Sequence, residues 1–319
     1  MTQETPVAAA PTPAPTPAPT PTPATQRRRL RRPGQTVAPL LFISLAFVLC
    51  VVFFVGPGAL GLYYSFTDYT GVGDPEFTGL TNYERLFGDE QFYSSIGRTV
   101  LYTVFAVPAH YVVALGISLL LVSAATRFRT AARVLFFLPW LISPIVTGVI
   151  WRWIFGENFG LVNYVITVLN LPRQQWETNG DLALVVVILA STWSGTAFTM
   201  LLFIAALRNI PKSYLEAAQV DGASAAQRFF RITLPLLRPT SFMVILLGTL
   251  GAMKEFAMVQ ALNGGGPGTE NMFIVQYIYQ TGFERAQIGY ASAVSMVLMV
   301  ILIVIAVVQM RFDRREDLS

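Results

Sequence analysis

The chain has 319 residues, of which 54% are hydrophobic and 13% charged, and its formal net charge is +4. A soluble domain carries about 25% charged residues, so this chain has too few charges to cover the surface of a water-soluble globule. One cysteine, Cys50, and one histidine, His110, exclude an internal disulfide, a cysteine-based zinc site and a histidine-rich metal site. The composition predicts a membrane protein surrounded by lipid and makes nucleic acid an unexpected partner.

Residues 1–36 are predicted to form a disordered cytoplasmic tail. A Pro-Thr-Pro-Ala repeat places eight of the twenty prolines in the first 25 residues, and such a repeat cannot bury a hydrophobic core. The tail contains no apolar stretch like that of a cleaved signal peptide. Five arginines follow the repeat, at positions 27, 28, 29, 31 and 32.

Six stretches without Asp, Glu, Lys or Arg follow the tail. They are residues 33–67, 99–126, 134–151, 182–207, 239–253 and 286–310. About 20 helical residues cross the hydrocarbon core of a bilayer, and the runs lack the alternation of a barrel strand. The fifth run is short, and it becomes long enough only if Lys254 and Glu255 belong to the helix. The predicted fold is all-α, with six transmembrane helices in residues 37–310.

Lys and Arg are concentrated on one side of this six-helix arrangement. The tail, the loops after the second and fourth spans, and the segment after the sixth hold 16 of the 22 basic residues. The loop 68–97 has six acids and a single basic residue, Arg85. Because loops rich in Lys and Arg stay in the cytoplasm, both termini are predicted to be cytoplasmic, with 311–319 as a C-terminal tail.

The sequence does not indicate an enzyme. It contains no P-loop, no H-E-x-x-H zinc motif and no G-x-S-x-G nucleophile motif. His110 has no catalytic companion near it in sequence, so a packing or hydrogen-bonding role is expected. Charges are nearly absent from the spans, which argues against a proton-coupled carrier or a voltage sensor.

The loop 208–239 carries the most specific signal. Helix-forming residues lead to Asp221-Gly222, a turn in which glycine accepts positive φ at a helix C-terminus. Ser224 can cap a second helix that continues through Ile232 and that Pro235 ends. The loop is therefore predicted to be a helix–turn–helix on the cytoplasmic face.

This loop resembles the EAA signature of the membrane subunits of bacterial ABC importers. The matching positions are Glu216, Ala217, Ala218, Gly222, Ile232, Leu234 and Pro235. The resemblance implies that the two helices dock in a cleft of an ATPase subunit, where Glu216 pairs with a basic residue. It also implies that ATP and Mg are bound by the partner ATPases, with no cofactor in this chain. The alternative is a pair of amphipathic helices lying on the membrane surface.

The resemblance extends over most of the chain beyond the tail, to the carbohydrate-uptake branch of this family. The segments that carry it are 65–69, 79–83, 136–140, 150–155, 264–267, 277–279 and Phe283. The last three are similar to the maltose-permease F-type subunit. This resemblance implies a bacterial inner-membrane permease with three kinds of partner: a second, G-type permease, two ATP-binding subunits and an extracytoplasmic solute-binding protein.

Two stretches are candidates for a solute site near the membrane midplane, where transporter helices are interrupted or carry small residues. They are 191–198 in the fourth span and 248–260 in the fifth. The positions that look like the sugar-lining positions of the maltose-type permeases are Ser191, Ser194, Gly195, Phe198, Gly248, Gly251, Ala252, Glu255 and Ala257. The three glycines would let a bulky ligand approach the backbone.

Glu255 is the preferred polar contact, because an ionisable residue within a span is unfavourable and usually functional. The alternative is a salt bridge or snorkelling beside Lys254 near the outer interface. Glu255 and Ala257 replace an amide and an acid of the maltose-type subunit, and Gly251 and Ala252 are smaller than their counterparts. Maltose itself is therefore not implied.

The sequence predicts a permease subunit of an ABC importer for a sugar of di- or oligosaccharide size. One alternative is an importer of a polyol or a glycerophospho compound, for which the outer half of these spans offers the single cation Lys254. The other is an ATP-independent channel or facilitator, which would have no reason to keep an ATPase docking loop.

Overall fold

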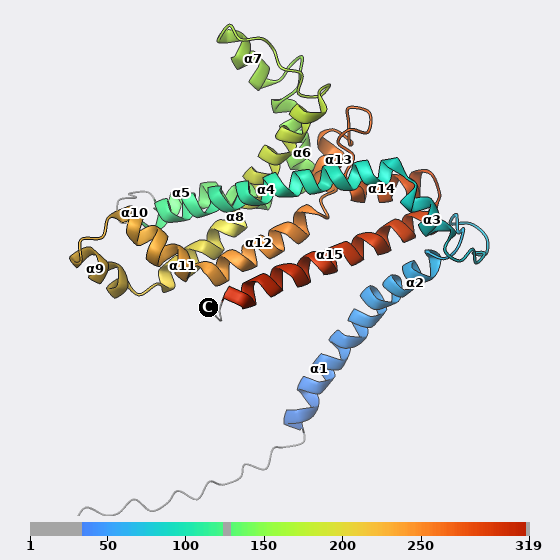
Figure 1. Cartoon of the computed structure of the whole chain (residues 1–319), viewed down its shortest axis with the longest axis horizontal. Coiled ribbons are helices and arrows are strands. Elements are labelled where there is room, and N and C mark those ends of the chain that lie inside the picture. Colours follow the sequence, from blue (N-terminus) through green and yellow to red (C-terminus); the bar gives the residue numbers. More distant parts are fainter. Residues whose placement is uncertain (1–33, 124–128, 317–319) are drawn as a thin grey trace, which may run out of the picture. The chain divides into compact units, whose positions relative to one another are not determined.

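A computed structural model describes residues 34–123 and 129–316, and this part of the chain is helical, with no β-strand (Figure 1). The α-helices are α1 (Gly34–Cys50), α2 (Gly56–Tyr64), α3 (Thr81–Phe87), α4 (Glu90–Val122), α5 (Arg129–Phe137), α6 (Pro144–Ile154), α7 (Leu161–Val168), α8 (Gly180–Asn209), α9 (Lys212–Val220), α10 (Ala225–Arg228), α11 (Leu234–Leu236), α12 (Arg238–Ala252), α13 (Ala257–Leu262), α14 (Ile274–Tyr279) and α15 (Ile288–Glu316). The π-helical turns are η1 (Val51–Val55), η3 (Phe229–Thr233) and η4 (Gln280–Glu284), and η2 (Leu138–Leu141) is a 3₁₀ turn. The all-α prediction is confirmed for these residues, whereas the Pro-rich repeat and the five arginines lie outside them.

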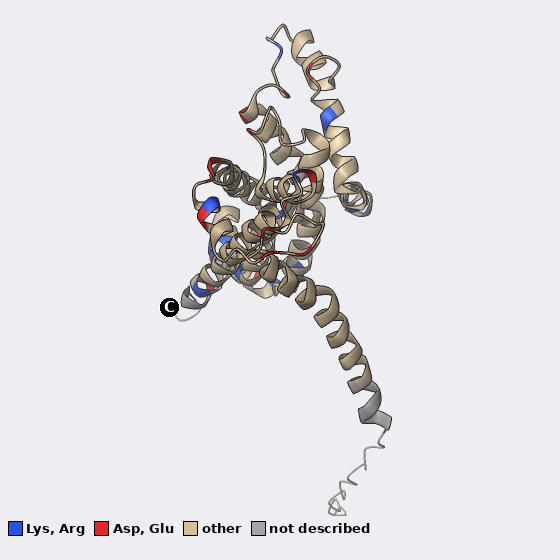
Figure 2. Ribbon diagram, turned by 90° about the vertical axis from the view of Figure 1, so that its right-hand side faces the viewer, with Lys and Arg blue, Asp and Glu red and all other residues tan. Residues whose placement is uncertain are grey.

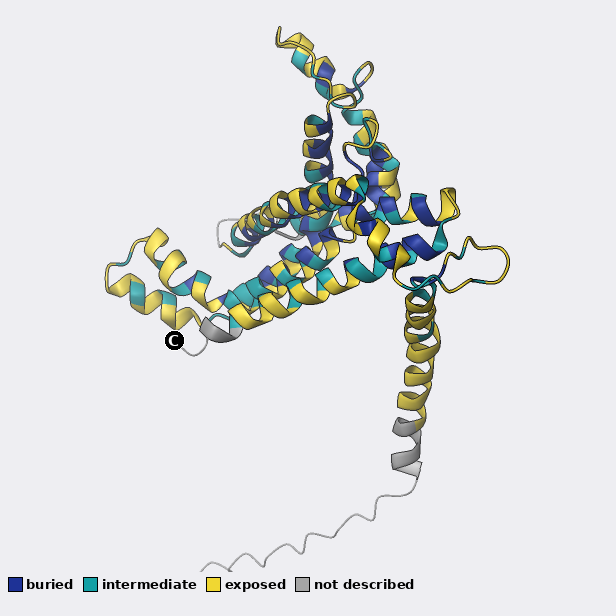
Figure 3. Cartoon of the chain, turned by 45° about the vertical axis from the view of Figure 1, so that its right-hand side comes forward, coloured by how far each residue is buried: buried dark blue, intermediate teal, exposed yellow. Residues whose placement is uncertain are grey.

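The described residues form two units, one ending at Val55 and one beginning at Gly56. In the first unit every side chain from Leu41 to Val55 is exposed, and nearly all of them are apolar. The second unit contains the buried residues, which Figure 3 shows along the helices from α3 to α15. Charged residues are sparse along these helices (Figure 2), as expected of segments surrounded by lipid.

Four stretches of the described chain are helices long and apolar enough to cross a membrane. They are Leu41–Tyr64, Glu90–Val122, Gly180–Asn209 and Ile288–Asp313. The third predicted span is two helices joined at a sharp bend, of 101° between α5–η2 and α6. The fifth is the single helix α12, which meets α10–α11 of the preceding loop at a bend of 67°. The described chain therefore has four candidate spans, or six if each bent pair counts as one.

The third predicted span bends because prolines interrupt its backbone hydrogen bonds. Proline lacks an N–H, so Pro144 is favoured at the first position of a helix and disfavoured inside one. Ser143 caps the new helix, with its side-chain oxygen accepting from the N–H of Val146 at 3.3 Å. The prediction of one continuous helix through 134–151 is wrong for this reason.

The fifth predicted span ends earlier than a crossing helix would require. Helix α12 stops at Ala252, and Lys254 and Glu255 lie in the connection to α13, so the prediction that they could extend the helix is wrong. The Glu255 carboxylate instead accepts a hydrogen bond from the N–H of Met258 at 3.2 Å. A side chain thus satisfies a backbone donor that the interruption would leave unpaired.

Helices α4 and α8 pack along each other and form the centre of the second unit. A buried cluster around Tyr102, Val187 and Phe273 lies toward the first residues of both helices, and another around Phe203 and Leu237 lies toward their last residues. Helix α6 crosses α13 at Gly148, where a Cβ would lie 2.5 Å from the carbonyl oxygen of Met258, so the crossing requires glycine. Members of both clusters line the cavity described below.

The Asp89 carboxylate ties the start of α4 to α14 and α15. Its Oδ1 accepts from the N–H groups of Gln91 (2.9 Å) and Phe92 (3.3 Å), and its Oδ2 accepts from the hydroxyls of Tyr277 and Tyr290. Burial by itself would raise the pKa of Asp89, but these hydrogen bonds outweigh burial and hold the pKa below its ordinary value. The carboxylate form is therefore the one that the fold stabilises.

Replacing Asp89 by Asn is expected to destabilise the purified protein by about 2 kcal/mol at neutral pH, because hydrogen bonds to a charged acceptor are lost. Folding lowers the pKa of Asp89, so the carboxylate contributes to stability at pH values above its pKa in the unfolded chain, about 4. That contribution is lost as the pH falls through its pKa in the folded protein. Melting temperatures in detergent across this pH range should show the difference between wild type and variant shrinking on acidification. A difference independent of pH would contradict this role, and the exposed Asp74→Asn is the control.

Candidate functional site

A cavity of about 560 Å³ lies among α4, η2, α8 and α12. Eight of the nine residues predicted to line a solute site lie in its wall: Ser191, Ser194, Gly195, Phe198, Gly248, Gly251, Ala252 and Glu255. The ninth, Ala257, is the first residue of α13 and does not line the cavity. Residues three, four and seven apart share one face of a helix, so the predicted residues of each stretch point the same way. The packing of α8 against α12 brings the two stretches, about 60 residues apart in the chain, to one cavity.

Hydroxyl groups form a polar row along this wall. Tyr102, which was not among the predicted site residues, lines this wall from α4, and the Ser191 hydroxyl beside it in the wall donates to the carbonyl of Ile188 at 3.0 Å. The Ser194 hydroxyl donates to the carbonyl of Ser191 at 3.3 Å. These groups can exchange hydrogen bonds with the hydroxyls of a polar solute.

An aromatic pair forms the facing part of the wall. The rings of Trp140 and Phe198 stack with centroids 5.2 Å apart and planes 19° apart, and both side chains are partly exposed. Trp140 was not among the predicted site residues, although its segment carried part of the family resemblance. The packing of η2 on α8 places Trp140 against Phe198, and the sequence pattern did not reveal this contact.

His110 explains why residue 195 is a glycine. A Cβ at Gly195 would lie 3.0 to 3.3 Å from three atoms of the imidazole, so the ring rests directly on this backbone. The imidazole thus occupies the Cβ position of Gly195, whereas Gly251 has no atom within 4 Å of its Cβ position. The contact of His110 with Gly195 agrees with the packing role expected for the histidine, and its buried Nε2 has no hydrogen-bond partner among the described residues.

Among the described residues, Glu255 is the one acidic residue in the wall of this cavity, and neither Lys nor Arg lines it. Lys254 lies instead against a separate apolar hollow between α12, α14 and α15. The ion pairs found among the described residues are Arg98–Asp181 and Arg152–Glu177, so the alternative of a Lys254–Glu255 salt bridge is not seen. In the same part of the chain, no cluster of three or more His, Cys, Asp or Glu residues could hold a metal ion.

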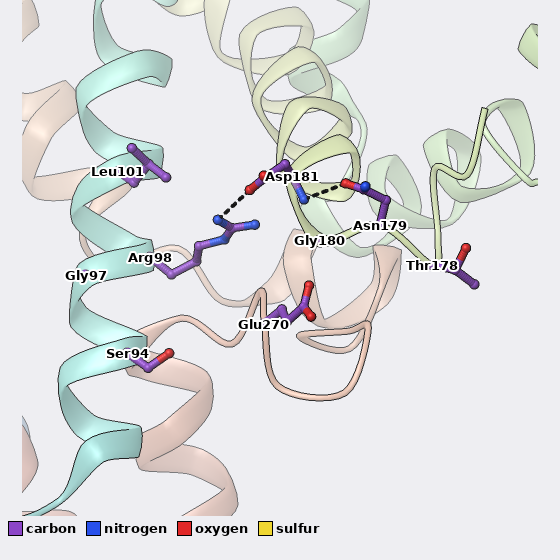
Figure 4. A pocket seen from close by; sticks show the side chains of 9 residues that line it. All are labelled: Ser94, Gly97, Arg98, Leu101, Thr178, Asn179, Gly180, Asp181 and Glu270. Atoms are coloured by element: carbon purple, nitrogen blue, oxygen red, sulfur yellow. Dashed lines mark hydrogen bonds and ion pairs between the residues drawn. The ribbon is translucent and has the colours of Figure 1, made fainter.

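A second cavity, of about 530 Å³, lies at the first turns of α4 and α8 (Figure 4). Arg98 crosses it to reach Asp181 at 3.0 Å, and it also donates to the side chain of Asn271 at 2.8 Å. Asn271 in turn donates to the carbonyls of Gly180 and Gly266. This network fastens the glycine-rich loop before α14 to both central helices, and its cation is already paired.

The segment 212–236 forms the predicted helix–turn–helix. Gly222 has φ +80°, and the N–H groups of Gly222 and Ala223 close the end of α9 onto the carbonyls of Gln219 and Ala218. This left-handed closing turn favours glycine because a Cβ would strain it. Ser224 and Gln227 cap α10 reciprocally, so the predicted cap is confirmed.

The seven predicted coupling residues lie on these helices. Glu216, Ala217, Gly222 and Pro235 are exposed, whereas Ala218, Ile232 and Leu234 are partly buried. Pro235 does not end the second helix, which continues to Leu236 before the bend. The π turn η3 precedes the proline, with the N–H of Leu234 bonded to the carbonyl of Phe229, and this wider turn accommodates a residue that lacks an N–H.

The helices, the central cavity and the exposed helix–turn–helix define a membrane-spanning transport subunit. Residues 111–317 match the family of binding-protein-dependent transport system inner membrane components. The sn-glycerol-3-phosphate transport system permease protein UgpA of Agrobacterium fabrum is 32% identical over 287 residues, covering 88% of this chain and 96% of that protein. The protein of the same name from Brucella abortus is 33% identical over the same shares. The chain belongs to this family, and it is a permease subunit of an ABC importer rather than an enzyme.

The fold is also that of solved ABC transporter structures. A bacterial alginate ABC transporter, in complex with an alginate pentasaccharide-bound periplasmic protein, contains a chain that superposes with a TM-score of 0.76 at 24% identity. A second structure of a transporter that imports alginate superposes with a TM-score of 0.75 at 23% identity. Each match covers 88% of this chain and 96% of the other. The architecture of this family is therefore present here.

Replacing Gly195 by Val is expected to destabilise the protein by about 1–3 kcal/mol, because the added methyl groups overlap the His110 ring. His110→Ala in the same chain should restore part of that loss, since the two residues touch. Melting temperatures of the single and double variants in detergent measure the coupling. Gly251→Val is the matched control in a helix, because its Cβ meets no neighbour. Equal losses at both glycines without rescue would contradict the contact.

Proposed function

We propose that this chain is one of two permease subunits of an ABC importer that carries a sugar, of di- or oligosaccharide size, across the bacterial inner membrane. The other expected parts are a second permease, two ATP-binding subunits that hold ATP and Mg, and an extracytoplasmic binding protein that delivers the solute. This chain supplies half of the translocation path and the attachment for one ATPase.

The observation that carries the sugar assignment is the composition of the central cavity. The stacked Trp140 and Phe198 rings offer an apolar surface of the kind that covers the C–H face of a pyranose. Hydroxyls of Tyr102 and Ser194 and the Glu255 carboxylate lie in the same wall and match a ring of hydroxyls. Pockets that combine an apolar lining with a few placed polar groups are typical of small-molecule sites.

Continuity between the helix–turn–helix and the cavity supports ATP-driven transport. Helix α8 enters the helix–turn–helix at Asn209, and α12 leaves it at Arg238. The same two helices carry seven of the predicted solute-lining residues. A displacement of the loop by a closing ATPase therefore moves two walls of the cavity together, which opens the site toward the outside.

The proposed topology has six spans and both termini in the cytoplasm. The third span is the bent pair of residues 131–154, and the fifth begins with α12, after the bend that follows α11. The helix–turn–helix and its flanks contain Arg208, Lys212, Arg228, Arg231 and Arg238, which favours the cytoplasm for this loop. We divide the chain into the tail 1–36, the transmembrane domain 37–310 with its coupling loop 208–239, and the C-terminal tail 311–319. In this topology the second cavity and the Asp89 network face outward.

A glycerophospho compound is the second candidate solute. It is favoured by the names of the relatives, which are sn-glycerol-3-phosphate permeases. The residues of the cavity favour a sugar, because a phosphate would need cationic partners and the wall contains no Lys or Arg.

Replacing Glu216 by Lys, or Gly222 by Asp, is expected to release the ATPase from the complex. The first change reverses the charge that meets the ATPase, and the second places a side chain at φ +80°. Co-purification from detergent should recover the ATPase with wild type and lose it with either variant. Solute-dependent ATP hydrolysis should fall about tenfold or more, which corresponds to ~1.4 kcal/mol of lost coupling.

Glu76→Lys, the same change in the acidic loop proposed to face outward, is the control and should leave the ATPase bound. Size-exclusion profiles that match wild type would show that the variants fold. A wild-type chain that purifies alone and still passes solutes in liposomes would overturn the proposal in favour of a facilitator.

A further inference from the structure

We propose that Glu255 makes this chain's half of the cavity selective for charge, admitting hydroxyl-rich solutes without an anionic group and preferring those that bear an amine. The inference rests on the proposed function, since it names the chemistry of the solute at the same site. It sets this chain apart from its relatives, whose names specify a phosphate ester.

The first observation is the charge of the wall. Within the part of the chain that the structure describes, Glu255 is its one acidic side chain, and neither Lys nor Arg lines the cavity. The nearest cation in sequence, Lys254, is exposed and lies against the hollow formed by α12, α14 and α15. An anionic solute would therefore meet a like charge on this wall without a compensating cation.

The second observation is how Glu255 is held. It lies where α12 has ended, and its Oε1 accepts the N–H of Met258 at 3.2 Å, which fixes the direction of the carboxyl group. None of the ion pairs among the described residues involves this carboxylate. A charge in a weakly polar cavity needs a partner, and the solute can supply it through a hydroxyl or, more strongly, an ammonium group.

The third observation is the surroundings of that carboxylate. The stacked Trp140 and Phe198 rings lie in the same wall and lower the local polarity. Electrostatic interactions strengthen as water is excluded, so both the attraction of an amine and the repulsion of a phosphate are larger here than at an exposed surface. Aromatic faces also attract cations, which adds to the preference for an amine.

The test uses the assembled transporter, purified in nanodiscs without the binding protein, whose own selectivity would otherwise dominate. Equilibrium dialysis measures the binding of glucose, glucosamine and glucose 6-phosphate, which share one ring and differ in charge, together with sn-glycerol 3-phosphate. Wild type should bind glucosamine at least as tightly as glucose and both about tenfold or more tightly than either phosphate ester.

Two substitutions separate charge from shape. Glu255→Gln keeps an oxygen for the N–H of Met258 and should abolish the preference for glucosamine over glucose. Glu255→Lys should reverse the order, so that the phosphate esters bind about tenfold or more tightly than glucosamine. Lys254→Gln changes an adjacent charge outside the cavity and should leave the order of wild type intact.

Phosphate esters that bind wild type as tightly as glucose, with no change of order in Glu255→Gln or Glu255→Lys, would overturn the charge selection and leave the importer assignment standing. A transporter that binds none of the four solutes, and whose ATP hydrolysis no sugar stimulates in the presence of its binding protein, would overturn the proposed function and this inference with it.

Discussion

The need to satisfy every backbone hydrogen bond away from water governs this structure. It makes the described chain helical, and it requires a substitute partner wherever a helix is interrupted within an apolar run. Ser143 supplies that partner at the bend before α6, and Glu255 supplies it between α12 and α13. The cavity lies beside these two interruptions, because a bent helix turns side chains inward that a straight span would direct toward lipid.

The position of Glu255 between α12 and α13 lets one carboxyl group bond the backbone and also line the cavity. The oxygen that accepts the N–H of Met258 closes the break, and the carboxylate to which it belongs is the charge in the cavity wall. A residue needed for the backbone is held more rigidly than one that projects freely from a helix. The fold thus sets the direction of the carboxyl group that we propose for solute recognition.

The helix–turn–helix and the cavity are joined by continuous helices rather than by a chain of side-chain contacts. The bend at Leu237 and the π turn before it lie between the exposed coupling residues and the part of α12 that lines the cavity. At the opposite end, Asp89 ties the start of α4 to α14 and α15, and Arg98 of α4 pairs with Asp181 in the first turn of α8. One end of the central helices is thus held by polar networks, while the other continues into exposed short helices.

The sequence by itself determined the class of protein, the apolar segments, the helix–turn–helix with its turn at Gly222, and eight residues of the cavity wall. These features depend on composition, helical periodicity and local backbone preference, which can be read over short distances in the chain. It did not determine the two bends, the contributions of Tyr102 and Trp140, or the contact between His110 and Gly195. Those depend on which helices cross and where a capped break replaces a continuous turn. The tertiary structure alone decided the bends, because a charge-free run looks the same in sequence whether its helix continues straight or bends. It also decided the contacts between helices, because helix faces distant in sequence meet only when the helices pack together.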